Sequence, residues 1–292
     1  MKHLLSLEKL ARSDMERILA DAVVFKKERN RHGKLPLAGQ TWALIFNKSS
    51  TRTRVSFEVG IRELGGQVLF LTANDIQIGR GEPIKDTARV LGRMIHGAVI
   101  RTYAQRDVEE FAQYSGVPTV NALTDDEHPS QALSDIFTSQ EKRGPIAKLE
   151  FELRIAAPEH YQPSREWFDR VTKATDRPCL LEGGSHRSNG RIVVTDDLRK
   201  AATGADLLYT DVWVSMGKEA EAAERIKALS GYQINRALVK LAKPNALIMH
   251  CLPAYRGKEI DEDTFEANAQ TIFDQAENRL HAQKSILSWL VS

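Results

Sequence analysis

Short apolar runs alternate with amphipathic stretches along almost the whole chain. This alternation is typical of parallel α/β architecture, in which helices connect buried strands. A first helix is predicted to begin at a capping box formed by Ser13 and Glu16. After it, strands are expected at residues 41–46, 68–72, 98–102 and 117–122, with helices at residues 53–64 and 84–95.

The second half of the chain repeats this pattern after a clear break. A helical stretch from Pro129 to Arg143 is followed by Gly144 and Pro145, a pair that ends helices. We place a junction between two domains here, because 292 residues exceed the usual size of one domain. Further strands are expected at residues 151–157, 191–195, 207–212 and 246–250, and a closing helix at residues 276–290.

Composition narrows the classes of function. A formal net charge of +2 is too small to indicate nucleic acid or a membrane surface as a partner. No apolar run approaches the roughly 18 residues that cross a bilayer, and the amino terminus becomes charged too early for a signal peptide. Two distant cysteines, Cys179 and Cys251, indicate a reducing compartment rather than a disulfide framework. We therefore expect a cytoplasmic location, with a processed organellar form as the alternative.

The most informative segment is residues 47–54, which follows an expected strand and precedes an expected helix. At a helix N-terminus, free backbone N–H groups and the positive end of the helix dipole favour a bound phosphate. The arginines of the segment add planar donor groups for oxyanions. The alternative is that Ser50 and Thr51 only cap the helix while the arginines are solvated. Neither a P-loop nor a G-x-G-x-x-G fingerprint occurs, so a nucleotide-binding loop is not expected.

These residues resemble a known family. Residues 50–54, Ser-Thr-Arg-Thr-Arg, are similar to the carbamoyl-phosphate motif of the aspartate and ornithine transcarbamoylases. Further matching segments occur in the family's order, at residues 77–87, 101–103, 128–131, 211–217, 250–254 and 277–284. The resemblance covers nearly the whole chain. It implies two Rossmann-like α/β domains with parallel sheets, joined by a linker helix and a C-terminal closing helix. The carbamoyl-phosphate-binding domain would be residues 1–137 with 276–292, and the ornithine-binding domain residues 138–275.

The resemblance also implies a site for carbamoyl phosphate. The residues assigned to its phosphate are Ser50, Thr51, Arg52 and Thr53. Those assigned to its carbonyl, amide and remaining oxygens are Arg101, His128, Gln131 and Arg279, with Cys251 and Leu252 as further contacts. Gln77 would lie on a loop that, in the family, enters the neighbouring subunit's site, which implies a homotrimer. The residues implied as catalytic are Arg101, His128, Gln131 and Cys251.

For the second substrate, the resemblance indicates ornithine. Asp211, Ser215 and Met216 match positions that hold its α-amino and α-carboxylate groups, and Cys251 matches the residue beside its δ-amine. The His-Cys-Leu-Pro-Ala segment at residues 250–254 favours ornithine over aspartate. The implied reaction moves the carbamoyl group to the δ-amine and gives citrulline and phosphate. No metal and no organic cofactor are expected.

The chemistry requires a neutral amine, because an ammonium has no lone pair. An alkyl amine has a pKa of about 10.4, so the site must favour the deprotonated form. A thiol or thiolate at Cys251 is a candidate for that proton transfer. A covalent intermediate is not expected, because no base is paired with this cysteine in the sequence. The arginines would stabilise charge on the tetrahedral oxygen and on the leaving phosphate, and closure of the two domains would align the reactants.

Each of these residues also has an ordinary structural interpretation when taken singly. His128 would be a structural histidine, Gln131 a surface helix residue, Arg101 a charge at a strand edge, Cys251 a small buried apolar residue and Asp211 a cap or turn residue.

The sequence departs from the family after the linker helix. The family has a strand, a Gly-Asp-Gly-type turn and a helix that bears an ornithine-binding asparagine, whereas residues 148–158 lead directly into the next strand. About two dozen residues, the size of a βα unit, are therefore expected to be missing. One hypothesis is that residues 151–157 occupy the vacant central position of a smaller sheet. The other is a weakly packed, marginally stable second domain. His186, Ser188 and Asn189 are candidates for replacing the lost contact.

Two functional alternatives follow from this departure. The first is a weakened or inactive paralogue that still binds carbamoyl phosphate or a trimer partner. The second is a transcarbamoylase with another amine acceptor, such as putrescine or an acylated ornithine. Residues 211–217 favour an α-amino acid, and the missing asparagine weakens that preference.

Overall fold

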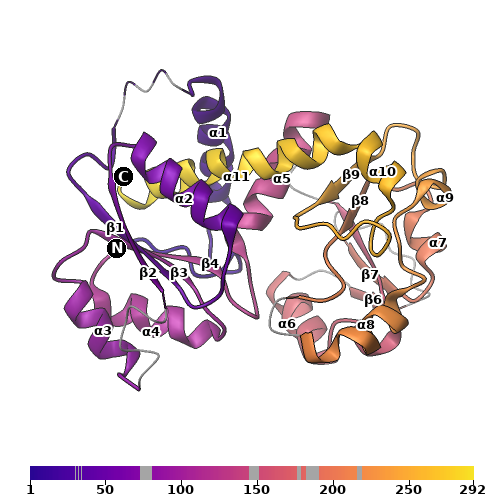
Figure 1. Ribbon diagram of the computed structural model, residues 1–292, viewed down its shortest axis with the longest axis horizontal. Helices are drawn as coiled ribbons and strands as arrows, with labels where there is room; N and C mark the ends of the chain where they lie inside the picture. Colours follow the sequence, from indigo (N-terminus) through magenta and orange to yellow (C-terminus); the bar gives the residue numbers. More distant parts are fainter. Residues whose placement is uncertain are drawn as a thin grey trace. The chain divides into compact units, whose positions relative to one another are not determined.

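The computed structural model describes residues 1–29, 31, 33, 35–72, 81–144, 151–175, 179–181, 191–215 and 219–292. The chain divides into two compact units, Met1–Thr138 with Ala276–Ser292 and Ser139–Gln275 (Figure 1). Each unit is built from parallel strands and helices, which confirms the expected α/β class. Two helices contribute residues to both units, α5 (Pro129–Arg143) and α11 (Ala269–Leu290).

The first unit contains a four-stranded parallel sheet in the order β2-β1-β3-β4. Its strands are β1 (Thr41–Phe46), β2 (Gln67–Thr72), β3 (Gly97–Arg101) and β4 (Thr119–Leu123). Its other helices are α1 (Arg12–Lys27), α2 (Thr51–Glu63), α3 (Ile84–Leu91) and α4 (Gln105–Ser115). The strands begin and end within two residues of the predicted ranges, because each is an apolar run. The sequence analysis did not predict α4.

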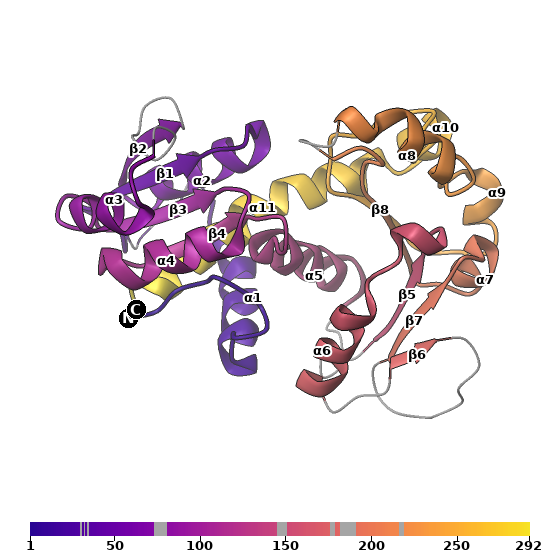
Figure 2. The ribbon, with the colours of Figure 1, turned by 90° about the horizontal axis from the view of Figure 1, so that it is seen from below.

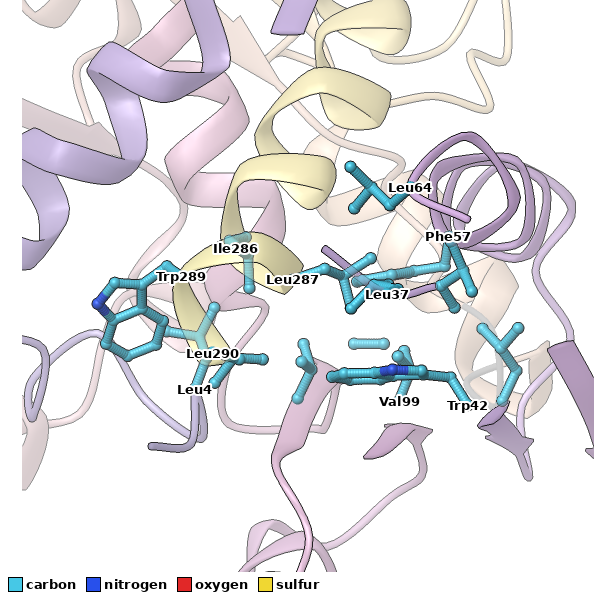
Figure 3. Close-up of a cluster of buried hydrophobic side chains, with 14 of the residues drawn as sticks. Leu4, Leu37, Trp42, Phe57, Leu64, Val99, Ile286, Leu287, Trp289 and Leu290 are labelled. Atoms are coloured by element: carbon cyan, nitrogen blue, oxygen red, sulfur yellow. The ribbon is translucent and has the colours of Figure 1, made fainter. Parts of the chain in front are cut away.

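Both faces of this sheet are covered, so successive side chains of β1 are buried in opposite directions. Trp42 and Leu44 belong to a core cluster that includes residues of α1, α2 and α11. Ala43 and Ile45 belong to a second cluster, which includes residues of α3 and α4 (Figure 1). Figure 3 shows side chains of α11, among them Leu287, beside those of the sheet and of α2 in the first cluster. The closing helix is therefore a component of the first unit's core.

The start of α1 differs from the prediction. The helix begins at Arg12, its N-cap is Ala11, and no side chain caps it. Ser13 lies inside the first turn, and Glu16 accepts a hydrogen bond from Arg12 Nε at 2.8 Å instead of closing a capping box. The predicted capping box is therefore wrong, because the partner of Glu16 is a charged side chain one turn away. Burial of the apolar face of the helix in the core stabilises it without a cap.

The sheet of the first unit has a topological switch point between β1 and β3. The chain proceeds from β1 outward to β2, and then from β3 outward to β4 on the other side. In open α/β sheets, ligands bind outside the carboxyl ends of the strands at such a point. The two strand ends are tied together here, since the Asn47 N–H donates to the carbonyl oxygen of Arg101 at 2.8 Å. The Asn47 amide also donates to Thr102 Oγ1 at 3.2 Å.

The strands of the second unit, labelled in Figure 2, form two sheets by their hydrogen-bonded pairing in the described part. The strands of the first sheet, in spatial order, are β5 (Glu152–Ala156), β7 (Arg191–Thr195) and β6 (Cys179–Leu181). Those of the second are β8 (Leu207–Thr210) and β9 (Leu247–His250). The helices are α6 (Arg165–Thr175), α7 (Leu198–Ala202), α8 (Ala222–Leu229), α9 (Arg236–Val239) and α10 (Glu262–Ala267), with 3-10 turns η3 (Glu159–Tyr161) and η4 (Glu219–Glu221).

The hypothesis that residues 151–157 fill a central position is wrong. β5 lies at the edge of its sheet, and in the described part of the unit no hydrogen-bonded ladder joins it to β8. All five residues of β5 pair with β7. Glu152 accepts hydrogen bonds from the guanidinium groups of Arg154 and Arg191. The full register and this charge pairing hold β5 beside β7.

The second unit buries its apolar residues unevenly. Its hydrophobic cluster gathers residues of β8, β9, α7, α9 and α10. On β5 and β7, by contrast, the described residues that are buried are Val194 and Thr195. Leu153 and Tyr209 are each 40% exposed, and Phe151 is 53% exposed. Apolar side chains on both sheets of this unit therefore remain in contact with water.

We expect the sheet of β5 and β7 to open more readily than the sheet of the first unit. Amide hydrogens of β7 should exchange about 100-fold faster than those of β1, because few buried apolar contacts oppose local opening. Hydrogen–deuterium exchange followed by mass spectrometry measures this difference. The edge strands β5 and β2 provide a matched pair, since both lack a neighbour on one side in the described sheets. Equal protection of β7 and β1 would contradict the expectation.

Candidate active site

The start of α2 provides backbone N–H groups and hydroxyls at the switch point of the first unit. Ser50 is the N-cap residue, and its side chain accepts a hydrogen bond from the Thr53 N–H at 3.3 Å. The predicted capping role of Ser50 is therefore present in the structure. It is compatible with anion binding, because a hydroxyl that accepts through oxygen keeps its own proton for a ligand. Thr51 and Arg52 form the first turn, where the helix dipole favours negative charge.

Arg101 is a buried cation at the end of β3. It is 4% exposed, so its interpretation as a charge at a strand edge is wrong. Burial, and to a lesser extent the positive charge of Arg52, lower the pKa of its guanidinium to about 10. Its Nε atom has no hydrogen-bond partner among the described residues. A cation held in this way is stabilised by a bound anion, because the anion restores the lost hydration and opposes the repulsion.

Two further side chains approach the same cations from distant parts of the chain. Arg279, on α11, is 4% exposed and donates a hydrogen bond from Nη2 to Thr53 Oγ1. His128 immediately precedes α5, and its Nδ1 lies 3.3 Å from Ser130 Oγ. Burial, and then the positive charges of Arg279 and Arg101, hold the pKa of His128 well below its ordinary value. The structure thus brings together residues separated by more than 200 positions in the sequence.

Gln131 lies on the first turn of α5 and is buried, so its interpretation as a surface residue is wrong. Its Nε2 donates to Asp135 Oδ1 at 2.8 Å, which leaves the amide oxygen as an acceptor. An amide oxygen available as an acceptor fits the recognition of an uncharged NH₂ group.

The lowered pKa of His128 predicts a pH dependence of stability. Between its folded and unfolded pKa values, the unfolded chain binds a proton that the folded chain does not bind. The free energy of unfolding should therefore fall as the pH decreases from about 7 to 5, by at most about 1.4 kcal/mol per pH unit for this group. Replacing His128 by glutamine should reduce that slope, as measured by urea denaturation at several pH values. His160, which is exposed, provides the control substitution to glutamine, and an unchanged slope in the His128 variant would contradict the assignment.

Lys48 is a candidate residue that the sequence analysis missed. It follows β1, its side chain is 7% exposed, and it forms an ion pair with Asp125. Its Nζ lies 4.3 Å from the centroid of the Tyr103 ring. The position of this lysine inside segment 47–54 was the signal that would have identified it.

In the second unit, the pairing of β8 with β9 brings two predicted residues into contact. The strands are in register with Thr210 opposite His250. The next residue on each strand is Asp211 and Cys251, and the thiol donates a hydrogen bond to Asp211 Oδ1 at 2.9 Å. The same oxygen accepts from the Val212 N–H at 2.7 Å. Cys251 is thus paired with a carboxylate, contrary to the expectation that no base accompanies it, and it is only partly buried.

Several predicted residues lie elsewhere or outside the described part. Ser215 is exposed, four residues after Asp211. Gln77, Met216, His186, Ser188 and Asn189 lie outside the described residues. In the described part, no group of three or more His, Cys, Asp or Glu side chains has the arrangement of a metal site. No described helix is both long enough and apolar enough to cross a membrane.

The two units thus contain groups of different chemistry. The first provides a helix N-terminus, buried arginines, a neutral imidazole and an amide, which together suit a small phosphorylated anion. The second provides a thiol and a carboxylate at the carboxyl ends of two parallel strands, which suits a cationic or amine ligand.

The chain matches known proteins along its whole length. Residues 2–141 match the family model described as "Aspartate/ornithine carbamoyltransferase, carbamoyl-P binding domain", and residues 144–290 match the "Asp/Orn binding domain" of the same family. The ornithine carbamoyltransferase of Akkermansia muciniphila is 50% identical, with 99% of this chain and 98% of that protein covered. The crystal structure of the anabolic ornithine carbamoyltransferase of Campylobacter jejuni has a TM-score of 0.89 at 38% identity and 99% coverage of both chains. The ornithine carbamoyltransferase of Pyrococcus furiosus also has a TM-score of 0.89, at 40% identity, with 99% of this chain and 97% of that chain covered. The chain belongs to the aspartate/ornithine carbamoyltransferase family.

Proposed function

We propose that the chain transfers the carbamoyl group of carbamoyl phosphate to the δ-amine of ornithine, giving citrulline and phosphate. The observation that carries this proposal is the buried cationic cluster at the switch point of the first unit, which lies within the match to a carbamoyl-phosphate-binding domain. The relatives named as ornithine carbamoyltransferases support ornithine as the acceptor.

In this proposal the first unit binds the donor. The helix N-terminus at Ser50–Thr53 and the Arg52 guanidinium hold the phosphate. Arg101 and neutral His128 donate hydrogen bonds to the carbonyl oxygen, where negative charge develops as the amine attacks. Gln131 accepts from the carbamoyl NH₂ group. Arg279 contacts the departing phosphate oxygens.

The second unit binds the acceptor. Asp211, Ser215 and Met216 hold the α-amino and α-carboxylate groups of ornithine, and the Cys251 thiol lies beside the δ-amine. The hydrogen bond between this thiol and Asp211 supports a role in proton transfer, because a thiolate and a carboxylate are both acceptors for an ammonium proton. Once neutral, the amine attacks the carbonyl carbon and the bond from that carbon to the phosphate oxygen breaks. The proton that the attacking nitrogen loses goes to the departing phosphate. Leu252, the next residue of the turn that carries Cys251, is a further contact of carbamoyl phosphate.

Citrulline formation tests the proposal. Purified protein with carbamoyl phosphate and ornithine should release citrulline and phosphate in equal amounts, measured by a colorimetric ureido assay and a phosphate assay. Aspartate in place of ornithine provides the control and should give no product. Absence of citrulline above the uncatalysed background would reject the proposed activity.

A weakened transferase is the second candidate, and one observation favours it. The second unit has two sheets with no ladder between them in its described part, and Leu153 and Tyr209 are partly exposed. A loosely packed acceptor domain would bind ornithine weakly while the donor domain still binds an anion. Calorimetry with inorganic phosphate and with norvaline, which lacks the δ-amine, separates the candidates. Phosphate binding without norvaline binding would favour the weakened form, and a panel that includes putrescine and acylated ornithine would reveal another acceptor.

The proposal extends to the oligomeric state of the protein, its cellular location and its metabolic role. We infer a homotrimer in which the loop that bears Gln77 enters the neighbouring subunit's site. The exposed apolar side chains Val55 and Leu69 support association of the first unit with another copy, since they are 53% and 41% exposed. Light scattering after size-exclusion chromatography measures the mass of the assembly. A cytoplasmic location and a role in arginine biosynthesis follow from the same proposal.

A further inference from the structure

Glu259 is a buried carboxylate to which the proposed chemistry gives no role. It is 0% exposed and lies between β9 and α10. Its Oε1 atom accepts hydrogen bonds from His250 Nε2, at 3.2 Å, and from the Tyr255 N–H. Its Oε2 atom has no hydrogen-bond partner among the described residues. Burying a carboxylate with so few donors is unfavourable, which indicates that its contact with His250 has a function.

The contact with Glu259 selects one tautomer of His250. His250 is 1% exposed, and its Nδ1 accepts a hydrogen bond from the Leu252 N–H at 2.9 Å. Nδ1 therefore carries no proton, and the single proton of the neutral ring lies on Nε2, where Glu259 accepts it. The other tautomer would place an N–H group against the Leu252 N–H and leave the carboxylate without that donor. A carboxylate behind a histidine fixes ring orientation in this way at many functional sites.

The group held by His250 is the backbone of the turn that carries the thiol. Leu252 has a φ of 60°, and among the described residues no other non-glycine residue has a positive φ. An L-residue adopts this conformation only when its surroundings fix it. The Leu252 N–H donates to the His250 ring at Nδ1. The backbone N–H of His250 in turn donates to Gln275 Oε1 at 2.9 Å. The turn so fixed places Cys251 Sγ 2.9 Å from Asp211 Oδ1.

We propose that Glu259 and His250 are positioning residues that hold the turn at Cys251 and Leu252 in the conformation required for carbamoyl transfer. The chain of contacts runs from Glu259 to the His250 ring, from the ring to the Leu252 amide, and from that turn to the thiol beside Asp211. This inference rests on the proposed function for its effect on turnover. Its effect on the thiol is independent of turnover.

Two substitutions at Glu259 separate hydrogen bonding from bulk. Glu259→Gln keeps an oxygen that accepts from His250 and from the Tyr255 N–H, and its NH₂ group replaces Oε2, which has no partner to lose. Glu259→Leu removes the acceptor. We expect Glu259→Leu to lower kcat about 10- to 100-fold, with the KM for carbamoyl phosphate unchanged. Glu259→Gln should retain kcat close to the wild-type value.

The thiol provides a readout that needs no activity. In a Cys179→Ser background Cys251 is the sole cysteine, and its rate of alkylation by iodoacetamide reports the placement of the thiol. This rate should change several-fold in Glu259→Leu and stay near the background value in Glu259→Gln. If Glu259 had only a structural role, Glu259→Leu would lower the free energy of unfolding and leave kcat and the alkylation rate of the folded protein unchanged. That result would overturn the proposal. If the wild type proved inactive, the proposed function would fail, while the alkylation rates would still decide the positioning role.

Glu259→Asp keeps the test decisive if the leucine variant does not fold. It retains the charge and withdraws the acceptor from His250 by one methylene group. We expect an intermediate loss of kcat and a change in alkylation rate of the same sign as in the leucine variant. Wild-type values for both in folded Glu259→Asp, together with altered values in Glu259→Gln, would show that charge rather than hydrogen-bond geometry matters and would contradict the proposal.

Discussion

Replacement of Arg101 by methionine is expected to lower kcat by about 10²- to 10³-fold, the usual effect of removing one donor to a developing oxyanion. The residue is buried, its pKa is lowered to about 10, and its Nε has no hydrogen-bond partner in the described structure. These properties indicate that its interactions are made with a ligand rather than with the protein. Steady-state kinetics of citrulline formation measures the effect.

The free energy of unfolding of the Arg101→Met variant should rise or stay unchanged, although kcat falls. The buried charge of Arg101 is disfavoured by burial and by Arg52, so the methionine variant should have an equal or higher free energy of unfolding in the absence of ligand. Arg106→Met provides the control, because that side chain is 90% exposed and should affect neither quantity. An Arg101→Met enzyme with wild-type kcat, or one that fails only because it unfolds, would contradict the proposed role.

Replacement of Asp211 by asparagine is expected to raise the KM for ornithine about 10- to 100-fold. A hydrogen bond to a charged group contributes about 1.5–3 kcal/mol, and each 1.4 kcal/mol is about a factor of ten in affinity. Asparagine retains an oxygen for the Val212 N–H and the Cys251 thiol. The rise in KM therefore measures the contribution of the negative charge of Asp211 to binding the α-ammonium group. Calorimetry with norvaline measures binding of the α-amino and α-carboxylate groups by themselves.

Asp206→Asn is the matched control for this experiment. Asp206 directly precedes β8, its side chain is 68% exposed, and it pairs with Lys243 at 2.8 Å on the surface. It should leave the ornithine KM unchanged. The KM for carbamoyl phosphate should be unaffected in both variants. If Asp211→Asn weakened carbamoyl phosphate as strongly as ornithine, the assignment of Asp211 to the acceptor would be wrong.

The sequence predicted the elements of the first unit because their signals are local. β1 is a continuous apolar run buried from Trp42 to Phe46, and segment 47–54 lies where that run meets the amphipathic pattern of α2. The contact between Arg279 and Thr53 spans 226 positions, and no local pattern indicates it. The resemblance to a family therefore had to provide that assignment.

The sequence failed where strand pairing decides the outcome. The division of the second unit into two sheets depends on which edges of β5 and β8 find partners, and apolar runs do not encode the choice of neighbour. The pair formed by Asp211 and Cys251 has the same origin, because it follows from the register of Thr210 with His250. Both residues were identified in the sequence, but their contact was not.

The position of α11 has a consequence for the order of events during synthesis. Its residues Ile286 and Leu287 complete the core around Trp42, and Arg279 on the same helix donates a hydrogen bond to Thr53. Lys2 donates a hydrogen bond to the carbonyl oxygen of Trp289, so α11 also contacts a residue 287 positions earlier in the chain. Until α11 has left the ribosome, the nascent first unit exposes an apolar face of its sheet and lacks Arg279 beside Thr53. We therefore expect the proposed donor site to form only after α11 has been translated.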